Sequence, residues 1–365
     1  MNSEKEQQKI RHAELQAWFQ GVLPTLDASS QENTGKVELK HLSGDASFRR
    51  YFISHVGDDS YVLVDAPPEK EDSRTFVQIA EKLYSSGIHV PRVFSTNFKK
   101  GFMCLSFLGD TLLWEKLDGL KQENKFAEVH KVYQEAFQTL LKIQGINEGS
   151  DILLPPFDST IMLAEMELFR EWMCGGIMDL TLTKEDNQIL DDFFEILIES
   201  ALTQVQVFAH RDYHSRNLMV QEDGSLGVLD FQDAVIGPVT YDLVSLIKDC
   251  YIIWPKSMIR EWALEYAALA QEAGIIDSVD KEQFIVSFDM MGLQRHLKAV
   301  GIFSRLYLRD GKPGYLADIP RTLAYIKEVL GEYPELETVS KWFEKKIYPM
   351  LVTRLHAVVK GKESL

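Results

Sequence analysis

The sequence predicts an α+β protein with a small antiparallel β-rich lobe followed by a large, mainly helical lobe. Residues 37–107 consist largely of short apolar runs rich in aromatic and β-branched side chains, which are typical of strands. Beyond Gly109 the apolar residues recur at helical spacing over long stretches. With 365 residues, the chain is long enough to build a core in each lobe. We therefore expect a bilobal protein, with residues 1–108 in the first lobe and 109–365 in the second.

The first lobe is expected to contain one amphipathic packing helix and five strands with a second helix inserted among them. Pro67-Pro68 ends the third apolar run, and Gly87 follows the inserted helix as a stop signal. The predicted helices span residues 4–23 and 74–85, and the predicted strands span 37–39, 48–56, 61–64, 92–96 and 102–107. A hinge is expected at residues 106–110.

Long helical patterns dominate the second lobe, and one strand-rich stretch, residues 205–230, interrupts them. Within that stretch, two apolar runs flank the turn-like sequence Glu222-Asp223-Gly224, which predicts a β-hairpin. The helical patterns span residues 126–143, 161–173, 184–202, 259–273 and 283–308.

Composition restricts the location and the partners of the chain. A formal net charge of -16 opposes sequence-independent binding to nucleic acid or to anionic lipid surfaces, because both need a cationic face. The amino-terminal residues are polar and charged, unlike a signal peptide. Three widely spaced cysteines favour buried, reduced thiols. We expect a cytoplasmic protein with no nucleic-acid or membrane partner, and we infer no obligate protein partner.

The strongest chemical signal is the segment that begins His210-Arg211-Asp212 and ends at Asn217. It fits the catalytic-loop template of kinases in all four of these residue types and in their spacing. Asp230-Phe231-Gln232 follows the predicted hairpin, so Asn217 and Asp230 could come together on neighbouring elements. Gln232 replaces the glycine of the usual kinase triplet.

Phosphoryl transfer explains why these residue types occur together. A nucleotide triphosphate is neutralised by metal ions, and an amide oxygen with a carboxylate suits Mg²⁺. Asn217 and Asp230 are the predicted Mg²⁺ ligands, and ATP is the predicted phosphoryl donor. Asp212 is the predicted catalytic residue, because a separate carboxylate must orient the acceptor hydroxyl and accept its proton.

Nucleotide contacts are expected from the first lobe. The turn before residue 48 contains Ser43, Gly44 and Ser47, whose small side chains let backbone N–H groups approach phosphate oxygens. At the hinge, Ser106 and Leu108 are further candidates.

The strand at residues 61–65 lacks the lysine that kinases use to bind phosphates. Arg49 or Arg50 could supply the positive charge instead, but alternation along a strand turns only one of them inward. We favour Arg49 and expect Arg50 to behave as a surface residue.

At His210–Asn217, Asp230-Phe231 and Tyr241-Asp242-Leu243, the sequence resembles the aminoglycoside phosphotransferase and choline kinase superfamily, which has a protein-kinase-like fold. The resemblance implies that His210 and Asp242 support the catalytic loop; for Asp242, a helix cap is the alternative. A narrower resemblance to the bacterial N-acetylmuramate/N-acetylglucosamine anomeric kinases is carried by several further segments: residues 43–52, Asp65-Ala66-Pro67-Pro68-Glu69, residues 229–241, Arg295-His296-Leu297-Lys298 and residues 308–318. It implies ATP-dependent phosphorylation of the amino-sugar C1 hydroxyl in peptidoglycan recycling.

The acceptor site is the least defined part of the sequence. An acidic sugar would need cations such as Arg295, His296, Lys298 or Arg305, and arginine recognises carboxylates bidentately. The remaining candidates for acceptor contacts are His214, Arg216 and Asp233.

Two alternatives to the amino-sugar kinase stay open. A cationic acceptor, such as an aminoglycoside or choline, would need the acidic and aromatic residues Asp158, Glu165, Glu167, Glu171 and Trp172. A pseudokinase scaffold is suggested by the missing lysine and opposed by Asp212, Asn217 and Asp230. The sequence leaves open the preferred acceptor, the choice between ATP and GTP, and the oligomeric state.

Overall fold

The structure is a computed structural model that describes residues 2–26, 37–42, 48–146 and 153–363. The chain forms two compact units. The smaller lies within Met1–Leu113 and Asn217–Gln232, and the larger within Trp114–Arg216 and Asp233–Leu365. The predicted fold class is confirmed, because the smaller unit contains a five-stranded antiparallel sheet and the larger is mainly helical.

The sheet of the smaller unit has the strand order β1-β2-β3-β5-β4. Its strands are β1 (Lys40–Leu42), β2 (Arg50–Val56), β3 (Asp59–Asp65), β4 (Val93–Asn97) and β5 (Phe102–Ser106). The helices of this unit are α1 (Asn2–Val22), the short 3₁₀ turn η1 (Leu23–Thr25) and α2 (Ser73–Ser85). The inserted helix therefore lies between β3 and β4, as predicted.

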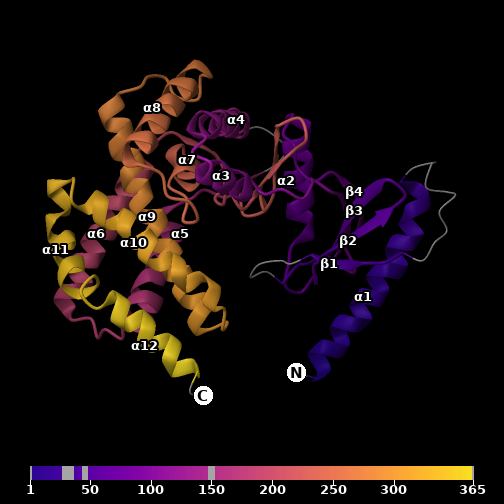
Figure 1. The fold of residues 1–365 in the computed structure, drawn as a ribbon, viewed down its shortest axis with the longest axis horizontal. Coiled ribbons are helices and arrows are strands. Elements are labelled where there is room, and N and C mark those ends of the chain that lie inside the picture. The colour runs from indigo at the N-terminus through magenta and orange to yellow at the C-terminus, as the bar shows by residue number, and fades with distance from the viewer. Residues whose placement is uncertain (1, 27–36, 43–47, 147–152, 364–365) are drawn as a thin grey trace. The chain divides into compact units, whose positions relative to one another are not determined.

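Helix α1 packs against one face of this sheet (Figure 1). Leu15 and Phe19 of α1 are fully buried in one cluster with Phe52, Leu63 and Phe102 of the strands. Because successive side chains of a strand point to opposite faces, the register assigns alternate residues of β2 and β3 to this covered face.

The first predicted strand is displaced in the structure. Residues 37–39 are not in a strand; pairing begins at Lys40, which lies opposite Ile53 of β2. Val37 and Leu39 are nevertheless buried in the cluster beneath α1. Their apolar pattern therefore reflects burial and not strand pairing.

The predicted hairpin is present and belongs to the smaller unit. Strands β7 (Leu218–Val220) and β8 (Leu226–Val228) pair antiparallel around the turn. Val228 donates its backbone N–H to the carbonyl of His89 at 2.7 Å, and Val220 donates to that of Thr111 at 2.9 Å. The chain thus returns to the smaller unit after the catalytic loop, whereas the sequence analysis expected a single boundary between residues 108 and 109.

The larger unit is built around the 28-residue helix α9 (Lys281–Leu308). Its other helices are α3 (Leu113–Gln122), α4 (Phe126–Gln144), α5 (Ser159–Leu168), the π-helix η3 (Phe169–Ile177), α6 (Lys184–Leu202), α7 (Thr240–Ile247), α8 (Lys256–Glu272), η4 (Pro313–Asp318), α10 (Ile319–Leu330), η5 (Pro334–Leu336), α11 (Glu337–Lys346) and α12 (Leu351–Glu363). Strands β6 (Gln206–Ala209) and β9 (Val235–Pro238) form a two-stranded sheet.

The helix predicted over 161–173 is divided in the structure. It begins at Ser159 as α5, and from Phe169 to Ile177 it continues as the π-helix. A Cβ at Gly301 of α9 would lie 2.5 Å from the backbone carbon of Leu168, so glycine permits the close approach of these helices. Among the helices that the structure describes, none is long and apolar enough to span a membrane.

Candidate active site

The predicted catalytic loop begins where strand β6 ends, and a buried carboxylate of helix α7 holds its first residues. Asp242 accepts hydrogen bonds from the backbone N–H groups of His210, at 2.6 Å, and Arg211, at 2.9 Å. Arg211 has a φ of +75°, a conformation that side-chain-bearing residues rarely adopt. Burial raises the pKa of Asp242 despite the nearby His210. Asp242 thus contacts the backbone at the start of the predicted loop, and the N-cap position of α7 is Val239.

Asp212 lies in a cationic environment within the larger unit. Burial alone would raise the pKa of its carboxyl, but the charges of Lys298, His214 and Arg295 outweigh burial and lower the pKa to about 2. Its backbone N–H lies 3.2 Å from Nδ1 of the buried His210. Asp212 is therefore held as a carboxylate over the whole ordinary pH range.

A second buried carboxylate, Glu165 of α5, pairs with Lys298 and with Arg211 of the loop. Its Oε1 accepts from Nζ of Lys298 at 2.9 Å and forms a close ion pair with Arg211, and Oε2 accepts from Gln294 at 2.9 Å. Burial would raise the pKa of Glu165, but Lys298 and Arg211 hold it below its usual range. Lys298 also donates to the hydroxyl of Tyr241 at 3.1 Å.

The hairpin of the smaller unit brings Asn217 and Asp230 together. Leu229 donates its N–H to the carbonyl of Asn217 at 2.9 Å, and Nδ2 of Asn217 lies 3.5 Å from Oδ2 of Asp230. Asp230 has a φ of +62°, is exposed, and accepts from Gln232 at 2.8 Å through Oδ1. The amide nitrogen of Asn217 is the atom that faces Asp230 here, but the amide oxygen and the exposed carboxylate are both oxygen donors of the kind that fits Mg²⁺.

Arg49 and Arg50 have different partners, although only Arg50 lies in β2; the predicted strand 48–56 begins two residues later than expected, so Arg49 immediately precedes it. Arg49, which is 6% exposed, pairs with Glu71 at 3.1 Å, and its guanidinium lies 5.6 Å from the ring centroid of Phe76 in α2. Burial is the main cause of the raised pKa of the Tyr51 hydroxyl. The charge of Arg49 lowers this pKa and the charge of Asp230 raises it, both to lesser extents. Arg49, Tyr51 and Asp230 therefore lie within electrostatic reach of one another.

The expectation that Arg50 is a surface residue is wrong. Arg50 forms a close ion pair with Asp65, which is fully buried on the sheet face covered by α1. Arg11 of α1 donates to the other oxygen of Asp65, with its Nε at 2.9 Å. The sequence could not show this, because it does not specify which strand end α1 covers.

Of the other predicted nucleotide contacts, the structure describes only the two at the expected hinge. Ser43, Gly44 and Ser47 lie outside the described residues. The hydroxyl of Ser106 accepts the N–H of Arg92 at 2.8 Å, and the carbonyl of Leu108 accepts from Gln221 at 2.7 Å. Leu108 thus contacts the residue that follows β7, within the smaller unit.

Aromatic side chains surround two of the predicted acceptor contacts. Arg216 stacks on Tyr251, with its guanidinium carbon 3.7 Å from the ring centroid, and lies 5.6 Å from the ring of Trp114. His214 meets the edge of Tyr251 at 5.4 Å between ring centroids. Asp233 is exposed, and its carbonyl accepts from Arg211 at 3.3 Å.

The two predicted contacts on α9 face different surroundings. Arg295 donates to the carbonyl of Arg211 at 3.3 Å and packs on Tyr241, beside the catalytic loop. His296 is buried, contacts the carbonyl of Lys248 at 3.1 Å and stacks on Tyr325, and burial lowers its pKa to about 3. These are the contacts of a core residue and speak against a role of His296 in acceptor binding.

The contacts of two residues beside these motifs emerge only from the structure. Glu165 entered the sequence analysis only as a candidate for a cationic acceptor, and Glu71 did not enter it. Both sit outside recognisable motifs, so their sequence signal is weak. The sequence places Glu165 on a helix, but only the fold shows that Glu165 meets Lys298 and Arg211.

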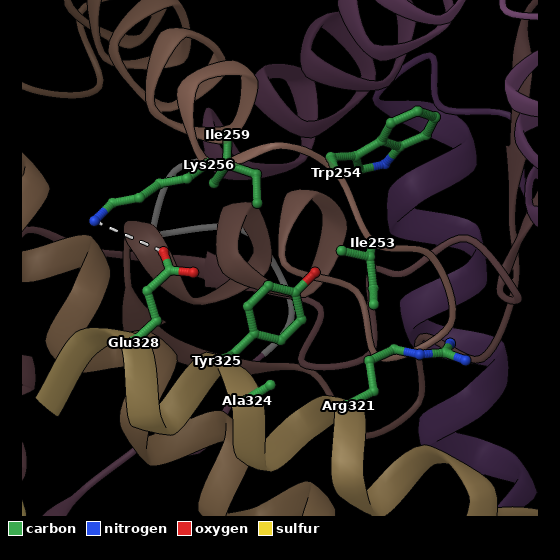
Figure 2. A pocket seen from close by; sticks show the side chains of 8 residues that line it. All are labelled: Ile253, Trp254, Lys256, Ile259, Arg321, Ala324, Tyr325 and Glu328. Atoms are coloured by element: carbon green, nitrogen blue, oxygen red, sulfur yellow. Dashed lines mark ion pairs between the residues drawn. The ribbon is translucent and has the colours of Figure 1, made fainter. Parts of the chain in front are cut away.

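The larger unit contains a pocket that is smaller than common ligand sites. It has a volume of about 90 Å³, well below the roughly 300 Å³ or more of common ligand sites. Figure 2 shows that helix α10, the start of α8 and the segment leading into α8 line it, with these residues: Ile253, Trp254, Lys256, Ile259, Arg321, Ala324, Tyr325 and Glu328.

Fold and catalytic loop together define a small-molecule kinase. The chain belongs to the phosphotransferase enzyme family, whose model matches residues 38–277.

Among curated proteins, the chain is similar to N-acetylmuramate/N-acetylglucosamine kinases of three bacteria. It is 41% identical to that of Pseudomonas putida over 330 residues, covering 90% of this chain and 94% of the relative. The chain is 40% identical to the Pseudomonas aeruginosa protein, and the match covers 89% of this chain and 94% of that relative. The Neisseria meningitidis protein is 36% identical, with 89% and 93% covered.

Solved structures share the fold at low sequence identity. A choline kinase from Cryptosporidium parvum matches with a TM-score of 0.60 at 12% identity, covering 90% of this chain and 99% of that one. The ADP-bound aminoglycoside phosphotransferase APH(2'')-Ib matches with a TM-score of 0.51 at 19% identity, covering 82% and 98%. Such likeness establishes the kinase-like fold, and the family supports use of a nucleotide.

Proposed function

We propose that this protein transfers the γ-phosphoryl group of ATP to the C1 hydroxyl of N-acetylmuramate, N-acetylglucosamine or both, as a step of cell-wall recycling in the cytoplasm. The observation that carries the proposal is the 41% identity, over nine-tenths of the chain, to a protein named as a kinase of these two sugars. Asp212, Asn217 and Asp230 are the residues to which we assign the chemistry.

The charge around Asp212 supports a neutral or acidic acceptor over a cationic one. A cationic acceptor needs uncompensated negative charge, but Glu165 is already paired with Lys298 and Arg211. Two other acids considered for that role are also engaged, since Glu167 pairs with Arg170 at 3.2 Å and Asp158 caps α5 at 3.0 Å. Lys298 is engaged in the same ion pair, whereas Arg295 donates to a backbone carbonyl, so Arg295 is the candidate contact for the carboxylate of N-acetylmuramate.

In the proposed reaction, Asp212 orients the acceptor hydroxyl and takes its proton as the new P–O bond forms and the bond from the γ-phosphorus to the departing ADP breaks. With a pKa of about 2, Asp212 is a weak base, so proton transfer must come late, after the P–O bond has largely formed. An anomeric hydroxyl suits such a base, because it is more acidic than an ordinary alcohol.

Arg49 is assigned the phosphate-binding charge that kinases obtain from a strand lysine. Its ion pair with Glu71, just before α2, is comparable to the lysine–glutamate pair of kinases, and its proximity to Tyr51 and Asp230 favours it over Arg50. Asn217 and Asp230 would hold Mg²⁺, which neutralises phosphate charge when bound.

The test is an ADP-release assay with Mg²⁺ and ATP, using N-acetylmuramate, N-acetylglucosamine, an aminoglycoside and choline as acceptors in parallel. We expect turnover with the amino sugars and a sugar 1-phosphate by phosphorus NMR. Turnover confined to the cationic acceptors would refute the proposed substrate class, and a phosphate at another carbon would refute the assigned position. Asp212→Asn is the control for contaminating kinases.

A further inference from the structure

The second half of the catalytic loop is held by a buried carboxylate that belongs to none of the kinase motifs. Asp249 follows helix α7 and is 2% exposed. It accepts the backbone N–H of Ser215 at 3.0 Å and forms a short hydrogen bond with the Ser215 hydroxyl through the same oxygen. Its other oxygen accepts the N–H of Tyr251 at 2.8 Å.

The geometry repeats the contact that Asp242 makes at the start of the loop. Asp242 lies in the first turn of α7, and Asp249 lies two residues beyond its last residue, Ile247, so the two carboxylates contact the loop from the two ends of one short helix. Asp242 binds the backbone at His210 and Arg211, and Asp249 binds it at Ser215. Asp212 lies between these two attachment points.

Further hydrogen bonds hold the segments on both sides of this contact. Ser215 is 1% exposed, and its carbonyl accepts the N–H of Trp114 at 2.9 Å. Arg321 of α10 donates to the carbonyls of Cys250 and Tyr251 at 2.9 and 2.8 Å. Figure 2 shows Arg321 reaching from α10 toward the chain segment before Trp254. Buried hydrogen bonds to a charged acceptor are strong and costly to break.

We propose that Asp249 is a positioning residue for phosphoryl transfer, which fixes the loop through Ser215 and thereby the placement of Asp212. This inference rests on the proposed function, since it assumes that Asp212 orients the acceptor. A displacement of about 1 Å in a catalytic group can reduce the rate roughly 100-fold, so loss of this attachment is felt in kcat. Neither Asp249 nor Ser215 is assigned a contact with the nucleotide or the sugar.

The test compares Asp249→Asn, Ser215→Ala and their combination with the matched control Ser245→Ala. Ser245 is also fully buried in α7, but its hydroxyl bonds only within the helix, to the carbonyl of Tyr241 at 3.1 Å. We expect Asp249→Asn to lower kcat about 10- to 100-fold with KM for ATP changed less than about twofold, and Ser215→Ala to lower kcat several-fold. The double variant is expected to resemble Asp249→Asn alone, because both changes remove one interaction.

Hydrogen exchange at the Ser215 amide gives a readout that does not depend on the substrate. Exchange is expected to accelerate in Asp249→Asn and to stay at the wild-type rate in Ser245→Ala. If the wild-type protein phosphorylates none of the sugars, the proposed function fails while exchange still tests the attachment. The inference is overturned if Asp249→Asn retains wild-type kcat and slow exchange. If Asp249→Asn does not fold, Ser215→Ala decides: unchanged kcat overturns the inference.

Discussion

Replacing Asp212 by asparagine is the most direct test of the proposed chemistry. The amide keeps the shape of the side chain but cannot accept the proton of the acceptor hydroxyl. Loss of a general base typically costs about 100- to 10,000-fold, and we expect kcat to fall by at least about 100-fold. Nucleotide affinity should change little, because Asp212 is assigned to the acceptor hydroxyl and not to a nucleotide or metal contact.

The same substitution should also destabilise the protein, in contrast to a neutral surface change. The pKa of Asp212 falls from its ordinary value of 3.8 to about 2, because Lys298, His214 and Arg295 favour the carboxylate despite burial. A pKa change of one corresponds to about 1.4 kcal/mol, so removing the charge at pH 7 should cost about 2 kcal/mol of unfolding free energy. Since the folded-state pKa is the lower one, this stabilisation is present above about pH 4 and is lost as the pH falls toward 2.

The assay combines steady-state kinetics with urea unfolding of wild type and variant at pH 7 and at lower pH values down to the limit of the folded state. The matched control is Asp192→Asn, which makes the same change at an exposed carboxylate of α6. The stability gap between wild type and Asp212→Asn should narrow as the pH falls below 4. A variant with near-normal kcat would remove Asp212 from the reaction, and a variant more stable than wild type at pH 7 would refute the cationic environment.

Three further predictions concern the smaller unit. Asn217→Ala and Asp230→Ala should each raise the Mg²⁺ concentration for half-maximal rate and lower kcat, and an unchanged Mg²⁺ titration in both would remove them as ligands. Arg49→Ala should raise KM for ATP and lower kcat; unchanged ATP kinetics would require another source of phosphate-binding charge. Arg50→Ala should leave KM for ATP unchanged. It should lower the unfolding free energy by about 2 kcal/mol, because it removes a hydrogen-bonded cation from buried Asp65. A decrease below about 0.5 kcal/mol in chemical unfolding would contradict this expectation.

Local patterns determined much of this protein from the sequence alone. Alternating and helical periodicities predicted the five-stranded sheet, the inserted helix and the hairpin, and α6 has the predicted bounds, Lys184–Leu202. The loop from His210 to Asn217 and the Asp230-Phe231 pair identified a kinase, because their chemistry depends on residue types at short spacing. Such patterns can be recognised in a single sequence because they depend on backbone geometry within a few residues.

Contacts between distant residues were decided only by the tertiary structure. Apolar residues 37–39 suggested a strand because burial and pairing produce the same pattern in a short run, and packing under α1 resolved the ambiguity. Arg50 could be assigned to Asp65 only once the strand register and the position of α1 were known. Likewise, Glu165 meets Lys298, and Asp249 meets Ser215, across separations in sequence that no periodicity encodes. The sequence alone thus determined which residues have the chemistry of phosphoryl transfer, whereas the charge around Asp212 and the support of its loop depend on helix packing.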